Sequence, residues 1–139
     1  MNSIYVLDTN TIIHYLHHNP IVVQNFENAI SAKNELIIPR IVDYEVRRGF
    51  EVKSAPNREI HYDEISRSMF CDVVNMGENF WHIAAQIYGS LYKQRFTVGD
   101  HDIIIGAFCI YNDYTLITAN VKDFQNMDRI KLVDWTYPV

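Results

Sequence analysis

Three acidic residues that lie far apart in the sequence occur where short apolar segments meet polar ones. Asp8 directly follows the apolar run 4–7, Glu45 lies in a partly apolar segment, and Asp102 precedes three isoleucines. Each carboxylate is therefore expected at the margin of the core, where an unpaired charge is costly. Mg²⁺ and Mn²⁺ prefer carboxylate and water oxygens as ligands and would remove that cost. The three acids predict a metal centre that polarises a phosphate and activates water for in-line attack.

Each of these acids also has a purely structural interpretation. Asp8 could cap the helix that follows it, since aspartate is favoured at that position. Glu45 could pair with Arg48 at the i to i+3 helical spacing. Asp100 could be the N-cap of a helix whose dipole favours Asp102 in its first turn. The prediction of a metal centre therefore depends on the three acids occurring together.

Apolar segments alternate with helical patterns along the chain. Strands are expected at residues 4–7, 36–38, 70–74, 115–118 and 130–133. Helices are expected at residues 12–16, 20–32, 41–50, 58–68, 79–94 and 103–111. This order predicts an α/β fold, a three-layer α/β/α sandwich with a mostly parallel central sheet. Because ligands bind beyond the carboxyl ends of such strands, Asp8 and residues 118–123 are expected at one functional rim.

The composition indicates one globular domain, residues 1–139, with 48% hydrophobic and 21% charged residues. No apolar run approaches the roughly 20 residues that cross a bilayer, and the first residues contain no basic stretch typical of a secretory signal. Cys71 and Cys109 lie in apolar surroundings, so we expect reduced thiols and a cytoplasmic protein. The net charge of −5 argues against binding nucleic acid through bulk positive charge, although clustered carboxylates are themselves acidic.

Four segments also match a known family, in order and at suitable separations. They are Val6-Leu7-Asp8-Thr9-Asn10, Tyr44-Glu45-Val46-x-x-Gly49, Gly99-x-x-Asp102-Ile103-Ile104-Ile105-Gly106-Ala107 and Leu116-Ile117-Thr118-Ala119-Asn120-x-x-Asp123-Phe124. Together they resemble the PIN-domain ribonucleases over essentially the whole chain. The closing Leu132-Val133-Asp134-Trp135 also looks like the end of the VapC-type toxins of type II toxin–antitoxin pairs.

The resemblance implies a three-layer α/β/α fold and endonucleolytic cleavage of RNA that depends on Mg²⁺ or Mn²⁺. By motif position, Asp8, Glu45 and Asp102 correspond to the metal-binding acids of the family. Within this interpretation Asp8 and Asp102 hold the metal, while Glu45 ligates it directly or orients the attacking water. The fourth acidic position stays open among three residues, which are Asn120, Asp123 and Asp100. For Asp123, we expect mainly that it caps a short helix following it.

The resemblance also implies an RNA substrate, with transfer RNA as one candidate, a cognate antitoxin protein and a homodimer. Six side chains are candidates for contacts with ligands or phosphate: Thr9, Asn10, Thr118, Arg47, Arg48 and Lys53. The last three could hold the RNA backbone, although solvated surface charge is the common fate of any one of them. The tyrosines are expected to pack in the core or between subunits rather than to stack on bases.

Other interpretations remain open at this point. A phosphatase-like hydrolase on a doubly wound fold would use Asp8 as a nucleophile, but the haloacid-dehalogenase type needs a second aspartate where this chain has Asn10. A catalytically silent PIN module that binds RNA or protein is disfavoured by the three retained acids. His14 and His18 share a helix face at i to i+4, yet no further ligand with suitable spacing completes a zinc site.

Overall fold

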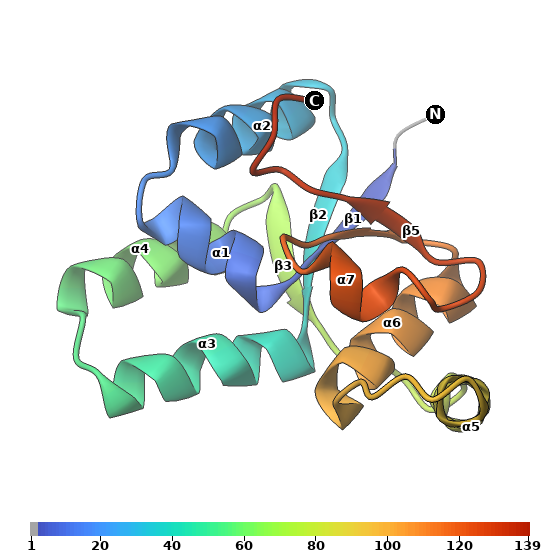
Figure 1. Cartoon of the computed structure of the whole chain (residues 1–139). Helices are drawn as coiled ribbons and strands as arrows, with labels where there is room; N and C mark the ends of the chain where they lie inside the picture. The colour runs from blue at the N-terminus through green and yellow to red at the C-terminus, as the bar shows by residue number, and fades with distance from the viewer. Residues whose placement is uncertain (1–2) are drawn as a thin grey trace.

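A sheet of five strands forms the centre of the molecule in the computed structural model, which describes residues 3–139 (Figure 1). Met1 and Asn2 lie outside the described residues, and they belong to the N-terminal segment in which the sequence shows no secretory signal pattern. The strands are β1 (Ile4–Leu7), β2 (Glu35–Pro39), β3 (Cys71–Val74), β4 (Thr115–Ile117) and β5 (Lys131–Val133). Their order is β3-β2-β1-β4-β5, and all four pairs of neighbours are parallel. The predicted parallel sheet is confirmed.

Helices connect successive strands and cover the sheet on both faces. They are α1 (Thr9–Leu16), α2 (Pro20–Ser31), α3 (Arg40–Val52), α4 (Pro56–Ser66), α5 (Trp81–Lys93), α6 (Asp100–Asn112) and α7 (Val121–Phe124). Because crossovers between parallel strands are right-handed, reversing the direction of travel across the sheet moves the helices to its other face. Figure 1 accordingly shows α1 to α4 on one side of the strands and α5 to α7 on the other, which confirms the three-layer α/β/α fold. Within residues 3–139, no helix is long and apolar enough to span a membrane.

The reversal between β1 and β4 decides where polar groups can meet. From β1 the chain moves outward to β2 and β3, and then returns to β4 on the other side of β1. The two strands pair in register at Leu7 and Ile117, and the Asp8 amide donates to the Ile117 carbonyl at 3.0 Å. The crevice beyond the carboxyl ends of β1 and β4 is therefore the switch point at which α/β sheets bind ligands. Asp8 and Thr118 lie there, as the sequence predicts.

Helix starts differ from two of the predictions. Helix α6 begins at Asp100, and its N-cap is Gly99 in an extended backbone conformation, so the alternative interpretation of Asp100 as the N-cap is wrong, although Asp102 does lie in the first turn. Helix α7 begins at Val121 after Asn120, so Asp123 lies inside this helix and does not cap a later one. In both cases the helix begins earlier than the apolar pattern indicates.

The histidine pair is also placed differently from its predicted position. Helix α1 ends at Leu16, and His18 follows in a left-handed backbone conformation with a φ of 61°. His14 and His18 therefore do not share a helix face. His18 instead stacks on His61, with the ring centroids 5.9 Å apart.

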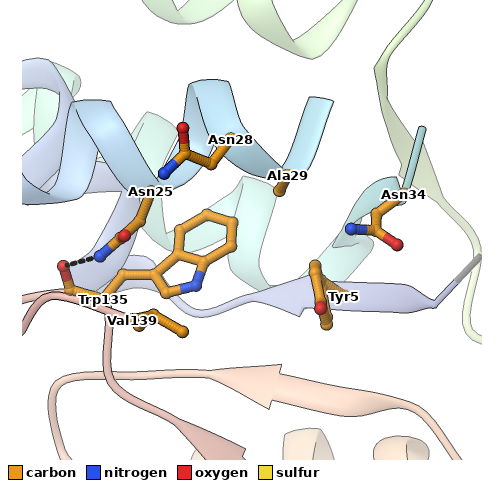
Figure 2. A pocket seen from close by; sticks show the side chains of 7 residues that line it. All are labelled: Tyr5, Asn25, Asn28, Ala29, Asn34, Trp135 and Val139. Atoms are coloured by element: carbon orange, nitrogen blue, oxygen red, sulfur yellow. Dashed lines mark hydrogen bonds between the residues drawn. The ribbon is translucent and has the colours of Figure 1, made fainter. Parts of the chain in front are cut away.

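Asn25 of α2 binds the segment that follows β5. This side chain is buried, and its Nδ2 donates to the carbonyl oxygens of Trp135 at 3.0 Å and Tyr137 at 2.9 Å. Figure 2 shows the bond to Trp135, whose indole packs edge-to-face against Tyr5 and Phe26. The last residues are thus attached to both α2 and β1.

We expect Asn25→Ala to lower the free energy of unfolding by about 1–3 kcal/mol, because the buried carbonyl of Trp135 and the partly buried carbonyl of Tyr137 lose their donor. Urea unfolding followed by tryptophan fluorescence measures the change. Asn28→Ala is the matched control, since Asn28 is exposed on the same helix and exposed substitutions change stability by about 0.5 kcal/mol or less. Equal losses in the two variants would show that the bonds to the closing segment contribute nothing.

Candidate active site

Asp8 is a buried carboxylate held in one orientation by three donors. It is 3% exposed and is the N-cap of α1, as one interpretation of the sequence predicts. Its Oδ1 accepts from the Thr9 amide at 2.8 Å, and its Oδ2 accepts from Thr118 Oγ1 at 2.8 Å and Asn10 Nδ2 at 3.2 Å. Burial raises the pKa of Asp8, although all three hydrogen bonds favour the ionised form. The result is a carboxylate with a fixed direction and a raised pKa.

Asn10 and Thr118 join the two strand ends that form the crevice. Asn10 Oδ1 accepts from the Ala119 amide at 2.8 Å, while its Nδ2 reaches both Asp8 and Thr118 Oγ1. The Thr118 hydroxyl is fully buried and also accepts from the Asn120 amide at 3.0 Å. Both residues therefore position Asp8, and a contact with phosphate stays a prediction for each of them.

Glu45 of α3 lies where three helices meet. Its Oε1 accepts a hydrogen bond from Thr9 Oγ1, at the start of α1, and contacts His101 Nε2, at the start of α6. Its Oε2 lies 3.7 Å from the guanidinium of Arg48. The predicted pair with Arg48 is thus present, but the side chain also faces the other acids. Glu45 is mostly buried and belongs to the same site as Asp8.

Asp102 is the acid most affected by its neighbours. Burial is the largest cause that raises its pKa to about 6, and the negative charges of Asp8, Asp123 and Glu45 raise it further. His101 acts in the opposite direction. The position in the first turn of α6 favours an anion through the helix dipole, so burial and neighbouring acids outweigh that effect. The structure therefore brings together the three acids that the sequence selects.

The three candidates for the fourth position differ in their surroundings. Asp123 lies in α7 and acts on Asp102 through its charge. The Asn120 side chain is exposed and makes no hydrogen bond within residues 3–139, although its amide binds Thr118. Asp100 is exposed at the first residue of α6, one residue before the histidine that contacts Glu45. Of the three, Asp123 has a charge that acts on Asp102, which favours it as the candidate for the fourth position.

Of the three basic candidates, Arg47 is held by ion pairs, whereas Arg48 and Lys53 are exposed. Arg47 binds Asp43 at 3.1 Å and Asp63 at 3.0 Å, and its guanidinium lies over the ring of Tyr62. It therefore attaches α3 to α4 instead of facing the crevice. Lys53 is exposed at the end of α3, remote along the helix from Glu45. Arg48 lies beside the acids, as its ion pair shows.

The donor set fits a hard divalent cation that is bound partly through water. Within residues 3–139, no three His, Cys, Asp or Glu side chains are close enough to hold an ion by themselves. Mg²⁺ usually keeps several waters and takes one or two carboxylates, which Asp8 and Asp102 can supply. The mutual repulsion that raises the pKa of Asp102 is the unfavourable interaction that a cation would relieve.

A separate hollow lies away from these acids (Figure 2). Its volume is about 160 Å³, and its lining residues are Tyr5, Asn25, Asn28, Ala29, Asn34, Trp135 and Val139. No acidic or basic side chain lines it. The candidate active site is therefore the group of carboxylates at the switch point.

We expect Asp102→Asn to stabilise the metal-free protein at pH 7 by about 1 kcal/mol, after allowance for the half-exposed position of the carboxyl. The folded chain holds the Asp102 proton more tightly than the unfolded chain does. This proton-linked stability of the parent chain is fully present below the unfolded pKa of Asp102 and is lost as the pH rises through about 6. The gain from Asp102→Asn should therefore appear at neutral pH and vanish at acid pH. Urea unfolding in EDTA at acid and neutral pH measures both effects.

The exposed Asp128 provides the matched control for this substitution. Asp128→Asn should leave both the stability and its pH dependence nearly unchanged. A loss of stability in Asp102→Asn at pH 7 would contradict the proposed repulsion among the acids.

Comparison with known proteins gives matches over nearly the whole chain. Ribonuclease VapC1 of Haemophilus influenzae (strain R2866) is 26% identical over 133 residues, which cover 96% of this chain and 98% of that protein. Ribonuclease VapC1 of Rickettsia felis is 37% identical over 70 residues, and this match covers 50% of the chain and about half (52%) of the length of that relative.

Solved structures show the same fold, and the family model identifies it. VapBC2 from Rickettsia felis, bound to a DNA fragment from its promoter, matches with a TM-score of 0.84, 22% identity and coverage of 95% of this chain and 98% of that one. DNA-bound VapBC from Salmonella typhimurium matches with a TM-score of 0.80, 25% identity and coverage of 97% and 99%. The PIN domain model matches residues 5–130, and this chain therefore belongs to the PIN domain family.

Proposed function

We propose that this chain is a metal-dependent endoribonuclease and the toxin of a toxin–antitoxin pair. The observation that carries the proposal is the meeting of Asp8, Glu45 and Asp102 at the switch point of a PIN fold. Relatives named as VapC ribonucleases, which match over almost their full length, support the activity and the toxin role.

Mg²⁺ or Mn²⁺ is the proposed cofactor, held by Asp8 and Asp102, with Asp123 as the favoured fourth acid. Such an ion, when bound, polarises the phosphate and lowers the pKa of the attacking water. The residues around Asp8 position it: Thr118, Asn10 and the Thr9 amide hold its carboxylate in one orientation. Glu45 ligates the ion or orients the water.

Two alternatives have less support. A phosphatase-like reaction of the haloacid-dehalogenase type needs Asp8 as a nucleophile and a second aspartate two residues later, whereas here Asp8 accepts hydrogen bonds from Thr9, Asn10 and Thr118. Asn10, which stands where the second aspartate of such an enzyme is needed, serves as one of these donors. A silent binding module would have no reason to keep mutually repelling acids in a partly buried site.

The partners of the chain are also proposals. The similar solved structures from Rickettsia felis and Salmonella typhimurium are VapBC assemblies, and we propose a cognate antitoxin for this chain by analogy. An acidic crevice favours an inhibitory segment that places a basic side chain among the carboxylates. We also propose a homodimer in the cytoplasm and a structured RNA substrate, with transfer RNA as the first to test.

Substitution of each principal acid should reduce RNA cleavage while leaving the chain folded. For Asp8→Asn, Glu45→Gln and Asp102→Asn we expect a decrease in the rate of about 100-fold or more, because each removes a metal-binding or proton-transferring carboxylate. Cleavage of transfer RNA in Mn²⁺ is followed by gel electrophoresis, and circular dichroism confirms folding. The exposed Asp128→Asn serves as the control, and full activity in all three acid variants would refute the assignment.

Removal of divalent ions should abolish cleavage, and added Mn²⁺ or Mg²⁺ should restore it. Because an ion that binds only the folded state stabilises it, saturating Mn²⁺ should also raise the melting temperature of the chain. This rise should be smaller in Asp102→Asn, which lacks one ligand. If the chain hydrolyses p-nitrophenyl phosphate but does not cleave RNA, the result would instead support the phosphatase interpretation.

A further inference from the structure

Tyr44 presents an exposed aromatic ring beside the candidate active site. It is 60% exposed, although it directly precedes Glu45 in α3, and this position differs from the expected packing of tyrosines in the core. Its neighbour one helical turn later is Arg48, whose guanidinium carbon lies 5.3 Å from the centre of the ring. No other aromatic ring pairs with Tyr44 in the described part of the chain. The ring is thus supported by Arg48 and largely open to solvent.

Arg48 has donors that the protein does not use. Its guanidinium lies 3.7 Å from Glu45 Oε2, and within residues 3–139 it makes no hydrogen bond. The adjacent Arg47 is different, because Asp43 and Asp63 bind it and hold α3 to α4. A guanidinium has five N–H donors in a planar fork that suits a phosphate. Arg48 is therefore a cation with free hydrogen-bond donors beside Glu45.

The two side chains together have the chemistry that recognises a single-stranded nucleotide. Unpaired bases stack on tyrosine rings, and arginine binds the phosphates that link them. The net charge of −5 provides no general attraction for RNA, so a local contact must place the strand near the acids. Arg48 links the ring of Tyr44 to Glu45, which puts a base site and a phosphate site next to the carboxylate that would act on water.

We propose that Tyr44 stacks on an unpaired base of the RNA substrate while Arg48 binds an adjoining phosphate. The proposal rests on the proposed ribonuclease function and assigns two residues that bind the substrate at unpaired nucleotides beside the cleavage site. A paired base cannot offer its face to Tyr44, because neighbouring bases in a helix cover both faces. The pair therefore selects single-stranded segments over duplexes.

The test measures RNA binding separately from cleavage. In an Asp102→Asn background, which should not cut RNA, fluorescence anisotropy gives the Kd for a short fluorescein-labelled single-stranded oligoadenylate. Tyr44→Ala should raise this Kd by about 5- to 100-fold, the loss expected for one stacked base. Tyr44→Phe keeps the ring face and should bind within about twofold of the parent. Tyr111→Ala is the control and should not change the Kd, because Tyr111 is 44% exposed but lies near the last residue of α6, at the opposite end of that helix from Asp102.

Salt dependence separates the roles of the two residues. Arg48→Gln should lower the slope of log Kd against log salt concentration by about 0.7, the value for one phosphate contact on a single strand. Tyr44→Ala should weaken binding without changing this slope. The same oligoadenylate paired with a complementary strand should bind weakly and should respond little to Tyr44→Ala.

The outcomes distinguish this proposal from the function on which it rests. If Asp102→Asn does not bind oligoadenylate and the unsubstituted chain does not cleave RNA, the ribonuclease function itself fails. If the parent binds and Tyr44→Ala binds equally well, the stacking proposal is overturned while the nuclease stands. Loss of binding in both Tyr44→Ala and Tyr44→Phe would also overturn it, because stacking does not need the hydroxyl group.

Discussion

The burial of like-charged carboxylates at one edge of a parallel sheet is the constraint on which the rest of this structure depends. Asp8 is almost fully buried, and the pKa of Asp102 is raised to about 6 by burial and by the neighbouring acids. A fold that only needed stability would place such groups in solvent. Hydrogen bonds to Asp8 offset part of this cost, and the divalent cation that we propose as cofactor would offset more of it.

Residues adjacent in sequence to two of the acids make contacts with the third acid, Glu45. Thr9, next to Asp8, donates to Glu45, and His101, next to Asp102, contacts the same Glu45 oxygen. Thr118 reaches Asp8 from the neighbouring strand. These contacts couple α1, α3, α6 and the end of β4, so a shift of one element would move the carboxylates of the others. At Gly106 of α6 the missing side chain leaves room for Met127, which follows α7, since a Cβ there would collide with the Met127 Sδ.

Much of the fold could be predicted because its signals are local. The apolar segments ending at Leu7 and Ile117 are strands because both faces of a central parallel strand are buried, and Asp8 follows the first of them. The first residues of the helices were harder to predict from the sequence. Gly99 caps α6 in place of Asp100, and Asp123 lies inside α7, because the path of the preceding loop decides where a helix begins. The apolar pattern carries no information about that path.

The sequence by itself determined the parallel α/β architecture and the three acids, because strand pattern and acid position are encoded by adjacent residues. Only the tertiary structure decided which polar groups meet across the crevice. Arg47 and Arg48 are identical in type and adjacent in the chain, yet one binds Asp43 and Asp63 while the other faces Glu45. The reason is the rotation of about 100° between successive helical residues, which directs one toward α4 and the other toward the acids.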